Sequence, residues 1–189
     1  MIQFIVYSAQ QAEIEKAAGT LKHPLQADFR EKTIGIIQTI TQILAKTNPK
    51  IVPIQDMILK HFGNTFQTLS VIFTDGDQLG NLVKDFLESI PDNEKRKMLK
   101  KNKLDIIKNV AKGDIFLNPD SRRYVLPKII SEIFYHFQGT SSEEKDVCIT
   151  VIADMIDNLQ SKALGGEEEV IIVSLDILSP LQTKDARST

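Results

Sequence analysis

The sequence "VLPKIISEIFYHFQGTSSEEKDVCITVIADMIDNL", from Val125 to Leu159, carries the two clearest helical patterns in the chain. Apolar residues recur in both halves at the spacing of one face of an α-helix. In the first half they are Leu126, Ile129, Ile130, Ile133, Phe134 and Phe137. In the second half they are Val147, Cys148, Val151, Ile152, Met155, Ile156 and Leu159. The pattern predicts two long amphipathic helices joined by a short turn.

Weaker versions of the same pattern run through most of the chain. Further helices are predicted over residues 27–46, 50–63, 64–73 and 77–90, then from Asp92 to about Gly113, and finally after the "GGEEE" segment. Residues 2–14 are expected to form a short apolar helix, with a strand as the alternative. Helices therefore account for nearly all of the regular structure that the sequence predicts.

The spacing of these helices indicates a repeat. Helix pairs open near residues 27, 77 and 121, and steps of roughly 45 residues are typical of armadillo and HEAT repeats. Each pair is apolar on a wide face that it can bury only against a neighbouring pair. The prediction is an all-α fold, an α-solenoid of armadillo/HEAT-like repeats, with residues 1–189 as a single helical-repeat segment. The alternative is one irregular helical bundle.

The "NPDSRR" segment before the first of the two long helices could be either a helix start or an anion site. Asp120 or Ser121 is predicted to cap the helix, and Pro127 to kink it or to separate a short first turn. Arg122 and Arg123 are expected on that exposed first turn. A helix start can bind phosphate, but the segment lacks a glycine-rich loop, so the structural interpretation is favoured.

Composition excludes several classes of protein. The 23 basic and 25 acidic residues give a net charge of −2, which argues against a dedicated nucleic-acid binder. Cys148 is the single cysteine, so it can form no internal disulfide and is expected to be a buried, inert thiol. His23, His61 and His136 are scattered, and no motif suggests catalytic, cofactor-binding or metal-binding residues. The sequence has no apolar run long enough to span a membrane. Its start is apolar but has no basic flank and no small-residue cleavage site, so it is expected to be a poor signal peptide.

The segment "KRKMLKKNK" is strongly basic. Its basic residues are Lys95, Arg96, Lys97, Lys100, Lys101 and Lys103. They could make weak contact with an acidic membrane or act as a nuclear-localisation-like patch. The favoured interpretation is a solvated helix between two repeats, with Met98 and Leu99 as its only anchors.

Several stretches together resemble a known family. In chain order they are "MIQFIVYSAQ", "DFREKTIGIIQTITQIL", "NTFQTLSVIFTDGDQLGNLVKDFLESIP", "FLNPDSRRYVLPKIISEIFYHF" and "KDVCITVIADMIDNLQ". They are similar to the middle helical region of the dedicator-of-cytokinesis (DOCK) family, which lies between a lipid-binding C2-like domain and an exchange domain. The resemblance covers nearly the whole chain, and no stretch matches either flanking domain.

The resemblance implies a non-catalytic scaffold segment of a guanine-nucleotide exchange factor for Rho-family, Rac-type GTPases. Its partners would be the other domains of the parent chain, the GTPase through the absent exchange domain, and an engulfment-and-motility (ELMO) adaptor. The parent would be cytoplasmic and recruited to the plasma membrane. The alternative is a free-standing helical-repeat adaptor that binds a protein or peptide in its groove, with an all-α enzyme as a third and less favoured class.

The last predicted helix is apolar around much of its circumference. Its apolar residues are Val170, Ile171, Val173, Leu175, Ile177 and Leu178. A terminal repeat normally presents a polar outer face, so this helix is expected to pack on a following helix that the chain lacks. Ile171 and Val173 are expected to lie on an exposed apolar patch that makes the isolated chain self-associate.

Overall fold

The computed structural model describes residues 25–70, 73, 75–91, 97–162 and 166–182. Within these ranges all regular structure is helical. The elements are α2 (Leu25–Leu44), the 3-10 helix η1 (Pro49–Ile51), α3 (Val52–Phe62), α4 (Thr65–Ser70), α5 (Gly76–Ser89), α6 (Lys97–Lys112), α7 (Asp114–Leu117), α8 (Pro119–Gln138), α9 (Ser142–Lys162) and α10 (Gly166–Gln182). The helix predicted for residues 2–14, and the helix start predicted at Asp92, lie outside the described residues.

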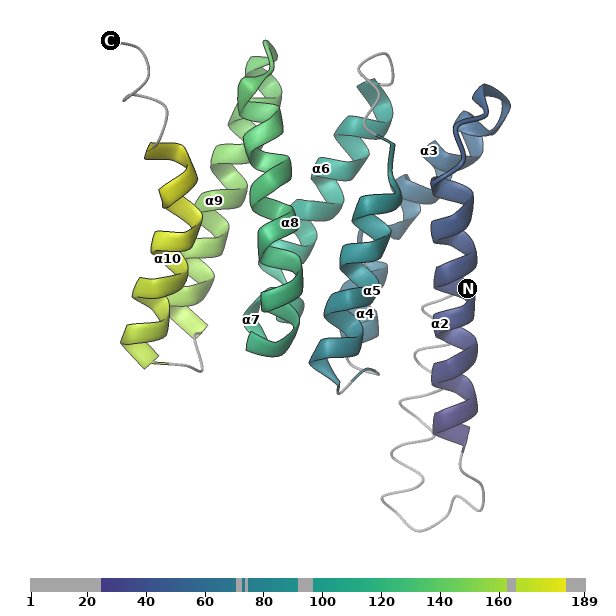
Figure 1. Ribbon diagram of the computed structural model, residues 1–189, viewed down its shortest axis with the longest axis horizontal. Coiled ribbons are helices and arrows are strands. Elements are labelled where there is room, and N and C mark those ends of the chain that lie inside the picture. The colour runs from purple at the N-terminus through teal and green to yellow at the C-terminus, as the bar shows by residue number, and fades with distance from the viewer. Residues whose placement is uncertain (1–24, 71–72, 74, 92–96, 163–165, 183–189) are drawn as a thin grey trace.

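The helices stack as repeats in two layers (Figure 1). One layer contains α2, α5, α8 and α10, and the other contains α3, α6 and α9. Each helix packs on the next helix in its own layer. The short helices α4 and α7 complete the first and second repeats. The solenoid prediction is therefore confirmed, and the predicted openings near residues 27, 77 and 121 correspond to α2, α5 and α8.

The hydrogen bonds between repeats join residues that are about one repeat length, roughly 45 residues, apart. Among the described residues, side chains bond to residues 45 to 47 positions away along the chain in four places. These pairs are Asn102 with Asp56, Asn109 with Asn64, Ser121 with Gly76, and Asn158 with Ala111. Equivalent positions in successive repeats therefore lie side by side, as stacked units of about 45 residues require.

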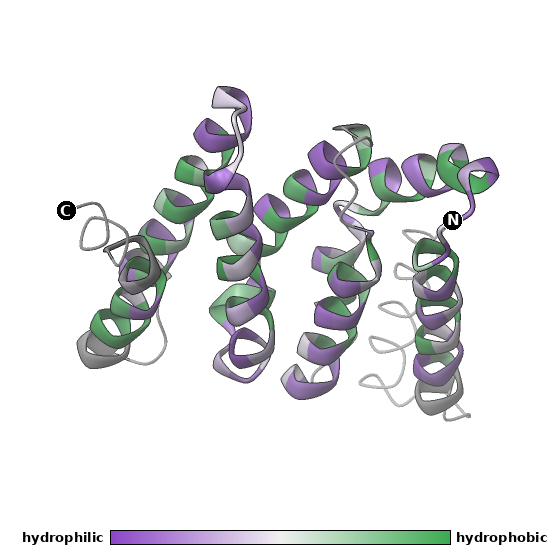
Figure 2. Cartoon of the chain, turned by 45° about the horizontal axis from the view of Figure 1, so that its top comes forward, coloured by the Kyte–Doolittle hydropathy of each residue, from purple (hydrophilic) through white to green (hydrophobic). Residues whose placement is uncertain are grey.

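The core is continuous through the stack because each α-helix from α2 to α10 contributes buried residues to it, and Figure 2 shows hydrophobic and hydrophilic residues alternating along the helices. Buried apolar side chains extend from Ile37 on α2 to Ile177 on α10. Between the first two repeats, the rings of Phe62 and Phe86 stack with centroids 4.7 Å apart, and Phe66 meets both rings edge-on. Such pairs add about 0.5–1.5 kcal/mol each beyond their burial.

Two details of the helix ends differ from the sequence-based predictions. Asn118 caps α8, accepting hydrogen bonds from the backbone N–H groups of Asp120 and Ser121, so the predicted caps at Asp120 or Ser121 are wrong. Helix α8 also continues through Pro127, and the short preceding turn is α7 instead. Proline removes one backbone hydrogen bond to the residue four positions earlier, Arg123; both residues are exposed, so water can hydrate the freed carbonyl.

The contact between α5 and α8 is close because it is built on glycine. A Cβ atom at Gly80 would lie 2.7 Å from the carbonyl oxygen of Ser121 and 2.8 Å from its Cα. These are backbone atoms, which a rotamer change cannot move away. The glycine therefore sets how closely the second and third repeats approach.

We expect Gly80→Ala to lower the free energy of unfolding by about 1–3 kcal/mol, the usual effect of forcing extra volume into a packed interface. Gly35→Ala is the matched control, since Gly35 lies within α2 and nothing approaches its Cβ position within 4 Å. That variant should gain up to about 1 kcal/mol from helix propensity. Thermal unfolding followed by circular dichroism measures both. Equal shifts of the same sign would show that the α5–α8 contact is looser than described.

Candidate functional site

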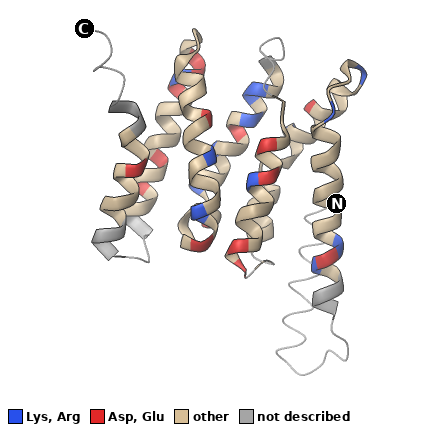
Figure 3. Cartoon of the chain, viewed as in Figure 1, with Lys and Arg blue, Asp and Glu red and all other residues tan. Residues whose placement is uncertain are grey.

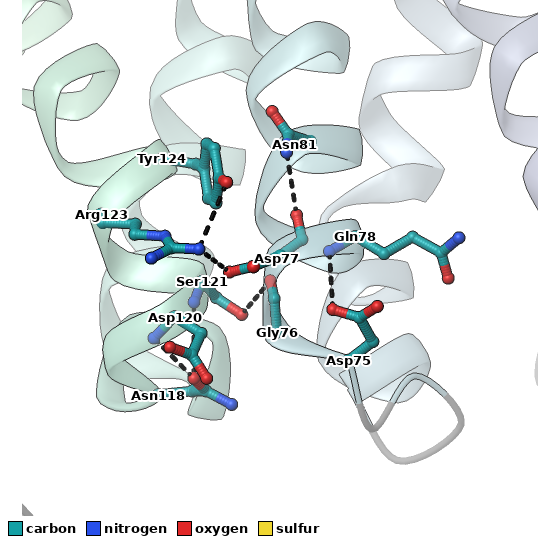
Figure 4. A network of polar contacts seen from close by, with 10 residues as sticks. All are labelled: Asp75, Gly76, Asp77, Gln78, Asn81, Asn118, Asp120, Ser121, Arg123 and Tyr124. Atoms are coloured by element: carbon teal, nitrogen blue, oxygen red, sulfur yellow. Dashed lines mark hydrogen bonds and ion pairs between the residues drawn. The ribbon is translucent and has the colours of Figure 1, made fainter.

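The junction between α5 and α8 contains a network of polar contacts (Figure 4). Asp75 caps α5 by accepting a hydrogen bond from the N–H of Gln78 at 3.1 Å. The Ser121 hydroxyl on α8 donates to the carbonyl oxygen of Gly76 at 2.9 Å, and this bond is buried. The starts of two successive first helices are thus joined directly, which fixes the register of the second and third repeats.

The two arginines of this junction have structural partners. Arg122 is buried, contrary to the expectation of an exposed position, and its Nη1 donates to the carbonyl oxygens of Phe116 and Leu117 at the end of α7. Arg123 is exposed; it forms an ion pair with Asp77 on α5 and donates a hydrogen bond to the Tyr124 hydroxyl. The Tyr124 hydroxyl, followed by the Asp77 carboxylate, raises the pKa of Arg123. These contacts favour the structural interpretation over phosphate binding.

A buried ion cluster joins the second and third repeats. The amine of Lys103 on α6 lies 2.7 Å from Oε1 of Glu132 on α8, and the amine of Lys128 lies 2.8 Å from the same oxygen. Lys103 and Glu132 are almost completely buried, with 2% and 4% of their side chains exposed, and Lys128 retains 19%. Ions buried at this depth are tolerated only when they are paired.

The basic segment is therefore not simply a solvated helix. Lys103 belongs to the buried cluster and cannot face a membrane, so that part of the predicted membrane contact is wrong. Lys100 lies over the ring of Tyr135 at 5.0 Å, and Lys101 forms a solvent-exposed ion pair with Glu143 at 3.6 Å. Figure 3 shows that both signs of charge are distributed over the two layers. Lys95, Arg96 and the side chain of Lys97 lie outside the described residues.

One of the two predicted anchors of this segment, Leu99, is confirmed, and the other, Met98, is wrong. Leu99 is buried, whereas Met98 is 58% exposed. Helix α6 is held to the stack by the ion pair of Lys103 and by its buried apolar residues, which are Leu99, Leu104, Ile106, Ile107, Val110 and Ala111.

Cys148 is buried on α9, as predicted. Burial raises the pKa of its thiol to about 11, and the nearby Glu144 carboxylate contributes in the same direction. A thiol with a raised pKa and no exposure has little reactive thiolate near neutral pH. The structure therefore supports the prediction of an inert thiol.

His136 on α8 is buried. Its Nδ1 lies 2.7 Å from Oε2 of Glu144, which connects the last turn of α8 to the first turn of α9. His61 is exposed, and His23 lies outside the described residues. No group of three or more metal-ligating side chains occurs among the described residues.

Two clefts run between successive helices of the α3–α6–α9 layer. The larger, about 790 Å³, lies between α3, α4 and α6 and combines apolar side chains such as Met57 and Ile58 with the amides of Asn64 and Asn109. The smaller, about 680 Å³, lies between α6 and the α8–α9 turn. Asp105 lines both clefts. Both volumes fall within the range of ligand sites. The larger cleft combines apolar groups with amides, whereas the smaller combines apolar groups with charged side chains.

The described helices contain none that combines the length and apolar character needed to cross a lipid bilayer. The buried polar groups described above all connect one helix to another. Stacked helical repeats that share a continuous core define the fold as an α-solenoid.

Comparison with known proteins identifies the family. Residues 2–183 match the family model for the dedicator of cytokinesis (DOCK) TPR region, and the chain belongs to this family. Two curated relatives, dedicator of cytokinesis protein 4 of Mus musculus and of Homo sapiens, are each 30% identical over 132 and 136 residues, respectively. These alignments cover 66% of this chain and 6% of each relative, so the chain corresponds to a small part of their length. No solved structure matches the chain.

Proposed function

We propose that this chain is a non-catalytic helical scaffold segment of a guanine-nucleotide exchange factor for Rho-family, Rac-type GTPases. In this role it holds a lipid-binding domain and an exchange domain of the parent protein at a fixed separation. The match of residues 2–183 to the DOCK TPR region carries the proposal. The continuous core and the buried contacts between repeats support it, because a spacer that keeps two domains at a fixed separation must be rigid.

The partners follow from the same proposal. They are the flanking domains of the parent, the GTPase through the exchange domain, and an ELMO-type adaptor in the cytoplasm, with recruitment of the parent to the plasma membrane. Lys100 and Lys101 remain candidates for weak contact with acidic lipid, although each already has a partner within the fold.

A second candidate function is a free-standing adaptor that binds a protein segment in a groove. The cleft of about 790 Å³ between α3, α4 and α6 favours it, because apolar groups and amides line it together. The two functions differ in what lies at the C-terminal end of the stack. A free-standing adaptor needs a polar end surface, whereas a scaffold segment needs a surface that meets the next part of the protein.

We expect the isolated chain to leave nucleotide release from a Rac-type GTPase unchanged. The buried polar groups of Lys103, Glu132 and Ser121 make contacts between helices, and the chain matches the helical region of the family. Release of a fluorescent GDP analogue, measured over a hundredfold range of chain concentration, provides the test. Acceleration that grows with the amount of chain would overturn the scaffold proposal, while an isolated DOCK exchange domain serves as the positive control.

A further inference from the structure

Helix α10 occupies the position of the first helix of another repeat. The first helices of the repeats begin at residues 25, 76 and 119, and α10 begins at residue 166, one repeat length of about 45 residues later. It packs against α8 and α9 and lies beside α8 in the same layer (Figure 1). Val173 and Ile177 form its buried side.

The opposite side of α10 is apolar and exposed. Ile171, Ile172 and Leu175 are 59%, 53% and 59% exposed, respectively, and we call these three residues the α10 face. Leu175 lies four residues after Ile171 and three after Ile172, the two spacings that place side chains on one side of a helix. The predicted exposed patch is thus confirmed for Ile171. It is wrong for Val173, which is 8% exposed because it packs on the core.

Helix α5 shows how a first helix looks when both of its neighbours are present. It is packed on α2 and on α8. Its exposed residues, Gln78, Asp85 and Glu88, are all polar. Its large apolar residues, Leu79, Leu82, Val83, Phe86 and Leu87, are all buried. The α10 face therefore has the composition of a covered side of a first helix, and it differs from the solvent-exposed side.

We propose that the α10 face is the docking surface for the next amphipathic helical repeat of the same solenoid. This inference deepens the proposed function and rests on the chain being part of a longer protein. The occupant must present an aliphatic helix side, as α8 does to α5. Asp176 is exposed beside the face and forms no ion pair among the described residues, so a basic side chain at the edge of the occupant would complement it.

The first test uses the 189-residue chain and measures its mass by light scattering over a wide concentration range. Without the next repeat, the α10 face should bind a second copy, and the mass should rise with concentration. The double variant Ile171→Lys/Leu175→Lys should weaken this association by at least about 100-fold, since each subunit loses two aliphatic contacts. Helix content by circular dichroism should stay unchanged.

The matched control is Ile36→Lys/Ile149→Lys, which adds the same charge at two exposed isoleucines on α2 and α9. It should associate like the unchanged chain. A chain that is monomeric at every concentration, or a double variant that associates as before, would overturn the proposal. Loss of helix in the α10 variant would overturn it as well, because the face would then already be covered.

A second measurement identifies the occupant. A chain lengthened by the following repeat, about 45 residues of the parent protein, should be monomeric and should show slower hydrogen exchange over α10. If the longer chain still forms dimers that the two lysines abolish, the occupant is a second copy, and the proposal is wrong. Neither measurement involves nucleotide release, so failure here is distinguishable from failure of the scaffold function.

Discussion

Replacing Glu132 with alanine is expected to lower the free energy of unfolding by about 3–5 kcal/mol. That is the usual cost of removing one partner from a buried ion pair. The variant leaves the buried amine of Lys103 without the carboxylate that lies 2.7 Å away, and it takes the same partner from Lys128. For a chain of this size the melting temperature should fall by roughly 6–20 °C, which thermal unfolding followed by circular dichroism would measure.

Glu143→Ala is the matched control for Glu132→Ala. Glu143 also pairs with a lysine of α6, Lys101. Both members of this ion pair are exposed, with 62% of the Lys101 side chain and 79% of the Glu143 side chain accessible. Exposed ion pairs contribute about 0–1 kcal/mol, so this control should melt close to the unchanged chain. Equal melting of the two variants would mean that Glu132 is not buried against Lys103.

The double variant Lys103→Met/Glu132→Leu distinguishes the effect of an unpaired buried charge from the effect of lost packing volume. Replacing a buried ion pair by apolar groups of similar volume is often neutral or stabilising. We therefore expect it to recover most of the stability lost in Glu132→Ala. If it is as unstable as the single variant, the loss arises from packing volume and not from an unpaired charge.

The second large effect is expected for Cys148→Asp, which should abolish the cooperative unfolding of the helical stack. Cys148 is fully buried on α9, and the carboxylate of Glu144 already disfavours negative charge there, as the pKa of the thiol shows. An ionised aspartate in this position would be buried near the Glu144 carboxylate, and a buried charge without a partner costs several kcal/mol.

Ile149→Asp provides the control for this second prediction. It introduces the same side chain at the next position of α9, where 55% of the isoleucine is exposed. The control should retain the helix content and the melting temperature within a few degrees. If Cys148→Asp melts like Ile149→Asp, the register assigned to α9 is wrong.

The helices and their stacking could be predicted because their cause is local. An apolar residue every three or four positions makes an amphipathic helix wherever it occurs, and α8 and α9 follow the stripes read from Leu126 and Val147. The repeat length could also be predicted, since it depends only on where the helices begin. The residues that actually cap the helices were harder to predict, because Asn118, Asp120 and Ser121 can each accept a backbone hydrogen bond.

The buried ion cluster could not be predicted, because it depends on a contact between two repeats. Lys103 lies in a run of lysines that looks solvated, and the carboxylate that neutralises it comes from α8. The one local signal was the spacing of Lys128 and Glu132 four residues apart on an apolar helix. Val173 was misplaced for a similar reason: a helix that is apolar on all sides does not reveal which side its neighbours cover.

The central claim, that the segment positions an exchange domain without taking part in exchange, is tested most directly in the longer protein. Release of labelled GDP from a Rac-type GTPase should be measured in solution and on vesicles that carry the GTPase, with and without Glu132→Ala. We expect the variant to lose exchange on vesicles and to keep the rate in solution. A fall in the solution rate, or unchanged rates in both settings although the segment has unfolded, would contradict the central claim.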